Sequence, residues 1–249
     1  LVRRRKDVFL ERNHRLQHWW SKSLLNGLQR LFQFNMQIEG EIPDCGGCFL
    51  FVRHVSSADT LLPLLTVIVP QNLRCHYVLK EELCWDPCLD IVGHRLPNAI
   101  VRRGRGGDAV EKVIRLTEVL SPQSCIVIYP EGTRFSERKR RSQIQRLEEK
   151  NSPDLAYVKQ LQCVLPPKKG GSLGLIDKKP ETPVVFIAHM GFDTVSNISN
   201  LVNGRLFQQK IFCAFWKKQA PTDTEQREEW LQQQWLELDK WLVEKQQQI

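Results

Sequence analysis

The sequence lacks any apolar run long enough to form a membrane-spanning helix. Such a helix needs about 18 or more consecutive apolar residues, whereas the best run, LLPLLTVIVP from Leu61, is much shorter and contains two prolines. The N-terminal residues do not have the pattern of a secretory signal peptide, and no internal repeat is visible along the chain. Within these 249 residues we therefore expect no segment that crosses a bilayer.

Acidic residues are scarce relative to basic ones. Lys and Arg number 36 against 28 Asp and Glu, which gives a net charge of +8. An excess of this kind favours an anionic partner, and a membrane surface, a nucleic acid or a phosphorylated small molecule would each fit. The basic run Arg138–Arg141 supports the nucleic-acid alternative, but no recognised nucleic-acid-binding motif accompanies it. We therefore expect no nucleic-acid partner.

The remaining composition is that of a folded protein, with 41% hydrophobic and 26% charged residues, and this excludes disordered and fibrous classes. The eight cysteines are scattered and several lie in apolar runs, which favours buried thiols in a reducing compartment. The pairs Cys45/Cys48 and Cys84/Cys88 could in principle supply four zinc ligands. The first pair lies in a Gly-rich turn and the second flanks Pro87, so we expect no metal.

Residues 13–34 have the pattern of an amphipathic helix, with Leu16, Trp20, Leu24, Leu28 and Leu31 at helical spacing. Two interpretations of this stripe stay open: it packs on the core, or it lies at a membrane interface, where tryptophan beside basic residues is typical. A basic cluster, residues 3–6, precedes it, and such clusters often follow a hydrophobic anchor on its cytoplasmic side. We expect residues 1–44 to form a membrane-interface segment, and the natural protein to be longer at this end.

The central part of the chain alternates short apolar runs with helical stretches, which predicts a single layered α/β domain over residues 45–220. A mostly parallel sheet is expected, flanked by helices. Residues 106–120 are predicted to form a helix with a capping box from Asp108 to Glu111, and residues 136–163 an inserted charged surface helix. Residues 221–249 are predicted to form a last helix after a second capping box, Thr222 to Glu225, with its apolar stripe packed on the core. The expected strands are CFLFV, HYVL, AIV, CIVIY, PVVFIA and KIFCAF.

His54 and Asp59 stand where a hydrophobic strand gives way to a helix, in the stretch FVRHVSSADTLLPLL. A carboxylate on the first helical turn can reach back to Nδ1 of a histidine at the strand end, which fixes the tautomer and leaves Nε2 free to take a proton. The spacing alone is weak evidence, because His76 and Glu81 share it. That second pair crosses a predicted strand, however, and a strand carries its two ends apart. The position of His54 and Asp59 favours a base and its orienting acid.

A second group of polar residues, YPEGTRF, directly follows the strand CIVIY. Ligands of α/β domains bind just beyond the carboxyl ends of strands, which places residues 131–134 where contacts are expected. Gly132 permits close backbone approach, Thr133 offers a hydroxyl, and the fork of Arg134 suits a phosphate. A turn with a surface arginine is the alternative.

Together, RHVSSAD and PEGTR resemble the glycerolipid (lysophosphatidic acid) acyltransferases, which carry an N-H-x-x-x-x-D block followed by a P-E-G-T-R block. KEELCWDPCLDIVGHRLPNAIVRR resembles the family's intervening block and points to Lys80 and Arg103, although Arg102 is the other possible alignment. TPVVFIA resembles the fourth block, and PPKKGG resembles a K-x-G segment of one subgroup. The resemblance covers residues 45–190. Arg53 departs from the pattern, because the family usually has asparagine there; the chemistry should survive, but acceptor preference could change.

The resemblance implies transfer of a fatty acyl group from a thioester, acyl-CoA or acyl carrier protein, to the hydroxyl of a lysophospholipid. It implies His54 as general base, Asp59 as its orienting acid, and Glu131, Gly132, Thr133, Arg134, Arg103 and Lys80 as substrate-binding residues. No cofactor is expected. The default product is phosphatidic acid made from 1-acyl-glycerol-3-phosphate, with glycerol-3-phosphate, another lysophospholipid or an aminolipid as alternative acceptors. We expect a membrane-associated enzyme facing the cytoplasm, and leave its oligomeric state open.

One further alternative is a serine hydrolase, because residues 170–174 satisfy G-x-S-x-G around Ser172. A nucleophile elbow requires a strand immediately before it, whereas LPPKK precedes this motif. The triad histidine should also follow the serine, and only His189 does so. This alternative is disfavoured.

Overall fold

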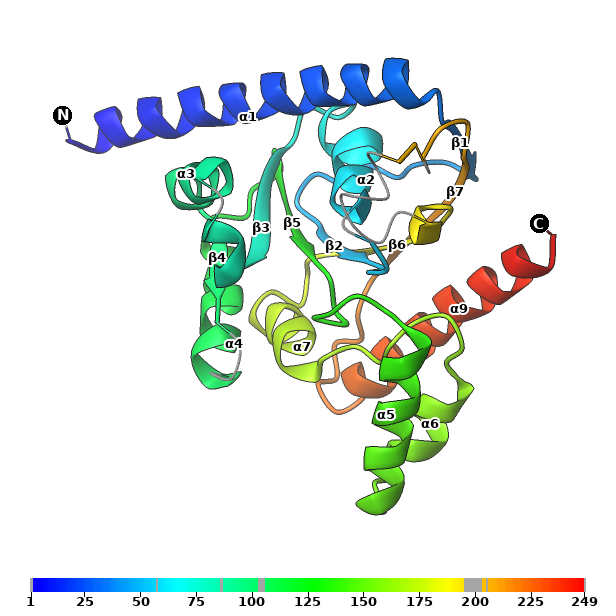
Figure 1. Cartoon of the computed structure of the whole chain (residues 1–249). Coiled ribbons are helices and arrows are strands. Elements are labelled where there is room, and N and C mark those ends of the chain that lie inside the picture. Colours follow the sequence, from blue (N-terminus) through cyan, green and yellow to red (C-terminus); the bar gives the residue numbers. More distant parts are fainter. Residues whose placement is uncertain are drawn as a thin grey trace.

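The computed structural model describes residues 2–56, 58–85, 87–102, 106–194, 203–204 and 206–248. It is a layered α/β domain built on a seven-stranded sheet of order β1-β7-β6-β2-β5-β3-β4 (Figure 1). Neighbouring strands are parallel except for the antiparallel pair β6 and β7. The predicted fold class is confirmed. The strands are β1 Asn35–Glu39, β2 Phe49–Val52, β3 Arg74–Lys80, β4 Ala99–Val101, β5 Ser124–Ile128, β6 Val184–Met190 and β7 Lys210–Lys218.

Helices cover both faces of the sheet, which is why its central strands are continuous apolar runs. In β2, Leu50 and Val52 join one apolar cluster, while Phe49 and Phe51 join the other on the opposite face. The described helices and single turns are α1 Val2–Phe32, η1 Ala58–Thr60, α2 Leu61–Pro63, η2 Leu64–Ile68, η3 Glu81–Trp85, α3 Pro87–Arg95, α4 Gly106–Arg115, η4 Leu116–Glu118, α5 Glu137–Glu149, α6 Leu155–Gln160, α7 Lys169–Lys178, η5 Phe192–Thr194 and α9 Arg227–Gln248.

Helix α1 is longer than predicted and turns a different face to the core. Its buried apolar side chains are Leu25 and Phe32, whereas Leu16, Trp20 and Leu31 of the predicted stripe are 52%, 48% and 67% exposed. The long helix lies across one end of the molecule, in contact with α3 and η2 (Figure 1). The interpretation of this stripe as core packing is therefore wrong for these three residues.

Three other local predictions need correction. Residues 35–39, expected within the N-terminal helical segment, form β1 and pair with β7. The capping box predicted at Asp108 and Glu111 is wrong, because α4 begins at Gly106 and Asp108 therefore lies inside its first turn; the two carboxylates pair with Lys112 and Arg115. In the tail, α9 starts only at Arg227, after the box predicted at 222–225.

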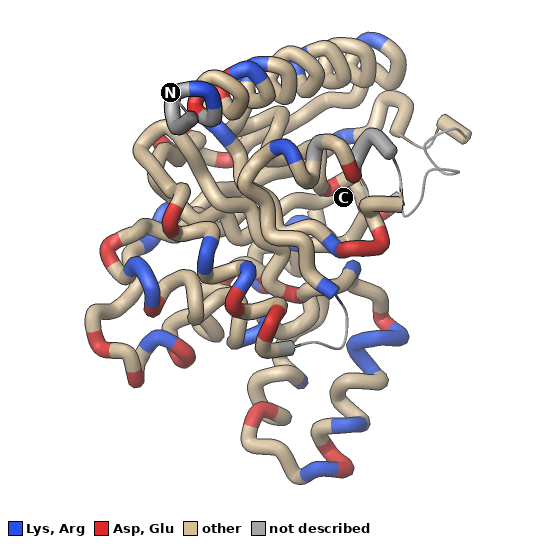
Figure 2. Tube along the Cα trace, turned by 90° about the vertical axis from the view of Figure 1, so that its left-hand side faces the viewer, with Lys and Arg blue, Asp and Glu red and all other residues tan. Residues whose placement is uncertain are grey.

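The C-terminal helix α9 packs its apolar stripe on the sheet, as predicted. Leu231, Trp235, Leu238 and Leu242 are all buried, and the indole N–H of Trp235 donates to the carbonyl of Leu165 at 2.9 Å. The inserted region is a pair of helices, α5 and α6, that projects away from the sheet. Basic residues recur along α1 and along this projecting pair, mixed with acidic ones (Figure 2).

Candidate active site

His54 and Asp59 meet in space at the carboxyl end of β2. His54 Nδ1 lies 3.1 Å from Asp59 Oδ2, and the Asp59 side chain is fully buried while that of His54 is 13% exposed. Because a carboxylate accepts hydrogen bonds, Nδ1 carries the proton and Nε2 is the basic nitrogen. Among the described residues, no hydrogen bond to Nε2 is present. This is the tautomer that a general base requires.

Asp59 is held rigidly by the turn that joins β2 to η1. Its Oδ2 also accepts from the backbone N–H groups of Val55 at 2.5 Å and Ser56 at 2.7 Å. Three donors therefore converge on one oxygen, which fixes the carboxylate before any substrate arrives. The ring of Tyr129 packs against the His54 imidazole with centroids 4.6 Å apart and limits its rotation.

Glu131 lies beneath this pair and is not open to solvent. One oxygen accepts from the backbone N–H of His54 at 2.8 Å, and the other from that of Leu165 at 2.9 Å. Burial raises the pKa of Glu131 to about 8, although the Leu165 and His54 donors and Arg53 act to lower it. Because both of its oxygens already accept backbone hydrogen bonds, Glu131 supports the loop that carries His54 and does not offer an oxygen to a ligand.

The turn at residues 132–134 lies directly beside His54. The backbone N–H of Phe135 donates to the carbonyl of His54 at 2.7 Å, so Arg134 is the residue next to this contact and is exposed. Thr133 accepts a hydrogen bond from Lys139 Nζ at 2.8 Å. Gly132 adopts φ +63°, a conformation in which a side chain is disfavoured.

Lys80 ends β3, and β3 neighbours β5, which neighbours β2. Because carboxyl ends of parallel strands share one edge of a sheet, Lys80, residues 131–134 and His54 lie along the same edge. Arg103 lies outside the described residues. The alternative, Arg102, pairs with Glu81 at 3.1 Å on the surface.

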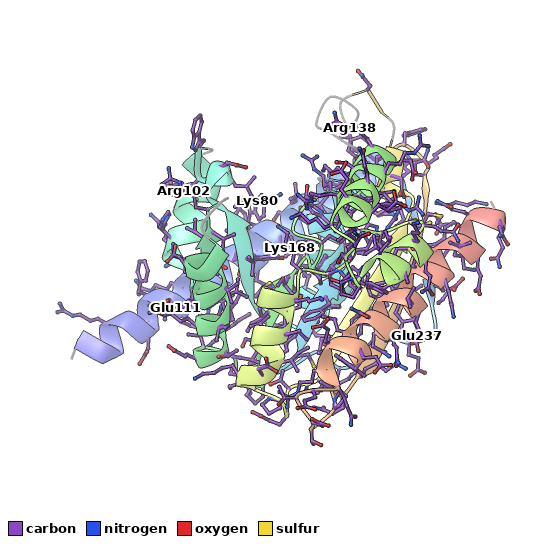
Figure 3. All side chains as sticks on the ribbon, turned by 90° about the horizontal axis from the view of Figure 1, so that it is seen from below. Lys80, Arg102, Glu111, Arg138, Lys168 and Glu237 are labelled. Atoms are coloured by element: carbon purple, nitrogen blue, oxygen red, sulfur yellow. The ribbon has the colours of Figure 1, made fainter. Side chains whose placement is uncertain are left out.

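Lys168 is a residue of this region that the sequence analysis did not assign. Its backbone N–H donates to the carbonyl of Pro130 at 2.8 Å. A Cβ placed on Gly132 would stand 2.8 Å from the Lys168 Cε and Nζ atoms, so the lysine side chain lies across the glycine. Figure 3 shows Lys168 and Lys80 near the middle of the molecule in that view. The segment PPKKGG contained the signal, because its resemblance to a K-x-G block marked this lysine.

The G-x-S-x-G motif has a packing role instead of a nucleophilic one. Ser172 is fully buried inside α7, and within the described chain its hydroxyl has no hydrogen-bond partner. A Cβ on Gly170 would stand 2.9 Å from Val110, and one on Gly174 would stand 2.7 Å from Ile114. The two glycines therefore let α7 approach α4, and the serine-hydrolase alternative is wrong.

Only two of the four side chains in the basic run Arg138–Arg141 are exposed. Lys139 turns inward to Thr133 and to the Arg134 carbonyl, and Arg140 Nε donates to the carbonyl of Leu161 at 2.5 Å. Arg138 and Arg141 are exposed. Two of the four cations thus hold the 131–135 turn and the projecting helices together.

Of the four cysteines considered for zinc, the Cys88 side chain lies outside the described part of the structure, and Cys45 and Cys48 do not group with other potential metal ligands within that part. Cys45 and Cys48 are buried and their thiols donate to backbone carbonyls. Burial raises the pKa of Cys45 to about 12, which disfavours the thiolate that zinc binds. Of the described residues, only Cys84, Asp90 and His94 group as potential metal ligands, and His94 is already paired with Asp90 at 3.0 Å.

The acyltransferase family model matches residues 33–171. This range covers more than half of the chain and includes the His54–Asp59 pair and the 131–134 turn. The chain belongs to the acyltransferase family. The fold of this acyltransferase is similar to that of the 1-acyl-sn-glycerophosphate (LPA) acyltransferase PlsC from Thermotoga maritima, with a TM-score of 0.57 and 18% identity over 91% of this chain and 81% of that one. No curated protein matches the sequence.

Proposed function

We propose that this acyltransferase moves a fatty acyl group from an acyl thioester to the free hydroxyl of a lysophospholipid, and that 1-acyl-glycerol-3-phosphate is the acceptor, giving phosphatidic acid. The observation that carries the proposal is the 3.1 Å contact between His54 Nδ1 and Asp59 Oδ2 beside a cationic edge of the sheet. An oriented base suits activation of an alcohol, and cations suit its phosphate.

In this mechanism His54 Nε2 removes the proton of the acceptor hydroxyl as its oxygen attacks the thioester carbonyl carbon. Asp59 stabilises the imidazolium that forms. The tetrahedral intermediate then collapses, the carbon–sulfur bond breaks, and the leaving thiolate takes the proton back from Nε2. A positioned base of this kind contributes about 10²–10⁴ in rate. No acyl-enzyme is needed, because the thioester is already activated.

The acceptor phosphate is assigned to Arg134, Lys80 and Lys168, with Arg103 as a further candidate. The exposed guanidinium of Arg134 belongs to the turn bonded to His54, and Lys168 lies across Gly132 of the same turn. Gly132 and Thr133 would line the same pocket. Glu131 would act by holding the His54 backbone. Acyl-CoA or acyl carrier protein serves as donor substrate, and no cofactor is required.

We propose that the enzyme is membrane-associated and faces the cytoplasm, and the outer face of α1 supports its association with a membrane. This face carries Phe9, Leu16, Trp19, Trp20 and Leu31, all exposed, and tryptophan with flanking basic residues is typical of interfacial helices. In the described residues, no helix has the length and hydropathy to span a bilayer. Co-sedimentation with anionic vesicles tests the proposal: Leu16→Ser with Trp20→Ser should lower binding, whereas Val119→Ser, at an exposed apolar residue outside α1, should not.

The reaction is tested with purified protein, labelled acyl-CoA or acyl carrier protein, and a panel of lysolipids. We expect turnover with 1-acyl-glycerol-3-phosphate, and a loss of about 10² or more in kcat for His54→Ala. Ser172→Ala is the matched control and should retain activity wherever it folds. Turnover only with glycerol-3-phosphate, another lysophospholipid or an aminolipid would replace the acceptor assigned here. Full activity of His54→Ala would contradict the mechanism itself.

A further inference from the structure

A second histidine, His189, lies behind the His54–Asp59 pair. It belongs to β6, the parallel neighbour of β2, and its side chain is fully buried. Its ring contacts Phe192 edge-on, with centroids 5.7 Å apart, and its Nε2 faces the carbonyl of Arg53, the residue just beyond β2. The mechanism proposed above does not use this residue, although its Nε2 lies 3.8 Å from Asp59 Oδ1.

His189 and Arg53 hold each other through reciprocal hydrogen bonds. His189 Nε2 lies 3.0 Å from the Arg53 carbonyl oxygen, and because a carbonyl only accepts, Nε2 must carry the proton. In return, Arg53 Nη1 donates to the His189 carbonyl at 2.7 Å. The Arg53 guanidinium also donates to the Cys163 carbonyl and to Asp193 Oδ1. These bonds anchor His189 from both sides.

The peptide bond that joins Arg53 to His54 is held at both of its polar atoms. Its C=O accepts from His189 Nε2, and its N–H donates to Glu131 Oε1 at 2.8 Å. Both polar atoms of one planar unit are therefore fixed by buried side chains, one on β6 and the other on the turn that follows β5. Since the planar unit includes the His54 Cα, holding its C=O and N–H fixes that Cα. The bond from the Phe135 N–H to the His54 carbonyl, at 2.7 Å, restrains the backbone on the other side, so the two together set the direction in which the imidazole projects.

His189 also faces the second oxygen of Asp59. Its Nε2 lies 3.8 Å from Asp59 Oδ1, and in the described part of the chain this oxygen has no hydrogen-bond partner. Burial lowers the pKa of His189, and Arg53 lowers it further, although Asp59 and Asp193 act in the opposite direction. A neutral imidazole leaves the negative charge of Asp59 available to the imidazolium of His54.

We propose that His189 is a positioning residue for the base, His54. As a neutral donor it fixes the Arg53–His54 peptide, and its Nε2 lies beside the Asp59 oxygen that has no hydrogen-bond partner in the described part of the chain. These two contacts set the reactive orientation of His54. The proposal rests on the proposed function, in which His54 is the base. A displacement of about 1 Å at a reacting group can cost about 10² in rate, so loss of this donor should act on kcat more than on substrate binding.

The test compares His189→Phe with His76→Phe, a matched change at another buried histidine. His76 lies on β3 and contacts the Pro97 carbonyl at 2.8 Å through Nδ1. We expect His189→Phe to lower kcat by about 10–10² with KM changed by less than about threefold, and His76→Phe to leave kcat within about threefold. His189→Gln restores a donor at the Nε2 position and should recover most of the loss. An equal kcat for the two Phe variants would overturn the proposal.

A second readout does not depend on turnover. In protein labelled with ¹⁵N in its six histidines, the His54 imidazole signals are assigned by their loss in His54→Ala. We expect these signals to shift in His189→Phe and to stay unchanged in His76→Phe; unchanged signals in both would overturn the proposal. If His189→Phe does not fold, His189→Asn, which is too short for the Arg53 carbonyl, is expected to give the same kcat loss and shift. If the wild-type protein shows no acyl transfer with any donor and acceptor of the panel, the proposed function is refuted. The spectra test the role of His189 independently of that result.

Discussion

Replacing Asp59 by asparagine separates the charge of this residue from its hydrogen bonds. The asparagine oxygen can occupy the place of Oδ2 and accept from His54 Nδ1, Val55 N and Ser56 N, which now lie 3.1, 2.5 and 2.7 Å away. Its amide nitrogen then takes the place of Oδ1, which has no partner among the described residues. The shape and bonding pattern survive, and the negative charge does not.

The magnitude follows from these distances. Three bonds to a charged acceptor become weaker bonds to a neutral one, while the desolvation cost of a fully buried carboxylate disappears, so the free energy of unfolding should change by less than about 2 kcal/mol. At 3.1 Å and an effective dielectric constant of about 20, the attraction between Asp59 and the imidazolium is at most about 5 kcal/mol. We therefore expect kcat to fall by about 10²–10⁴.

Urea unfolding and initial acyl-transfer rates measure the two effects on the same preparations. Asp59→Ala serves as the contrast, because it leaves the N–H groups of Val55 and Ser56 unpaired and should cost about 2–6 kcal/mol of stability in addition to activity. The reasoning is refuted if Asp59→Asn keeps more than about a tenth of the wild-type kcat, since the charge would then contribute little. It is refuted equally if Asp59→Asn is as unstable as Asp59→Ala.

The remaining predictions concern the supports of the site. Folding raises the pKa of Glu131 from 4.5 to about 8, so between these pH values the folded protein binds more protons than the unfolded chain. The free energy of unfolding should therefore fall as pH rises through this window, by up to about 1.4 kcal/mol per pH unit. Glu131→Gln should flatten this slope, as measured by urea unfolding across pH. Gly132→Ala should cost about 1–2 kcal/mol and displace Lys168, which an increase in KM for the acceptor would report. Lys168→Ala should raise that KM about tenfold while Lys168→Arg restores it, and an unchanged KM would remove Lys168 from the phosphate site. Arg53→Lys keeps the charge but loses the fork and should lower the thermal midpoint, as followed by circular dichroism.

The sheet could be predicted from sequence because its strands are buried on both faces. Six apolar runs became six strands, since a run such as CFLFV has too few residues for a helix and its flanks carry turn residues. Strand β1 was missed because it is short and mostly exposed, so its apolar alternation is limited to Met36 and Ile38. The two predicted capping boxes were wrong because α4 begins before Asp108, at Gly106, and α9 begins after Glu225, at Arg227. The spacing of two polar residues does not fix the residue at which a helix starts.

The candidate site was predictable where one segment contains both partners. His54 and Asp59 are close in sequence, and the strand-to-helix turn between them brings their side chains together. Their supports come from elsewhere in the chain. His189 reaches the site through the strand order, whereas Leu165 and Lys168 reach it on the loop before α7, through bonds to Glu131 and Pro130. No local pattern marks a backbone N–H or a buried imidazole as a contact. The orientation of α1 stayed open for a related reason, because an apolar stripe indicates burial against the protein core or in a membrane interface without deciding between them.

The position of β2 explains why so many supports converge on His54. Its parallel neighbours are β5 and β6, and a residue just beyond the end of a central strand has a neighbouring chain on either side. Glu131 follows β5 and binds the N–H of His54, while His189 near the end of β6 binds the carbonyl before it. An edge strand could supply only one of these contacts. The proposed general base must be oriented toward the acceptor hydroxyl, and a position between two parallel neighbouring strands lets the backbone that carries it be held from both sides.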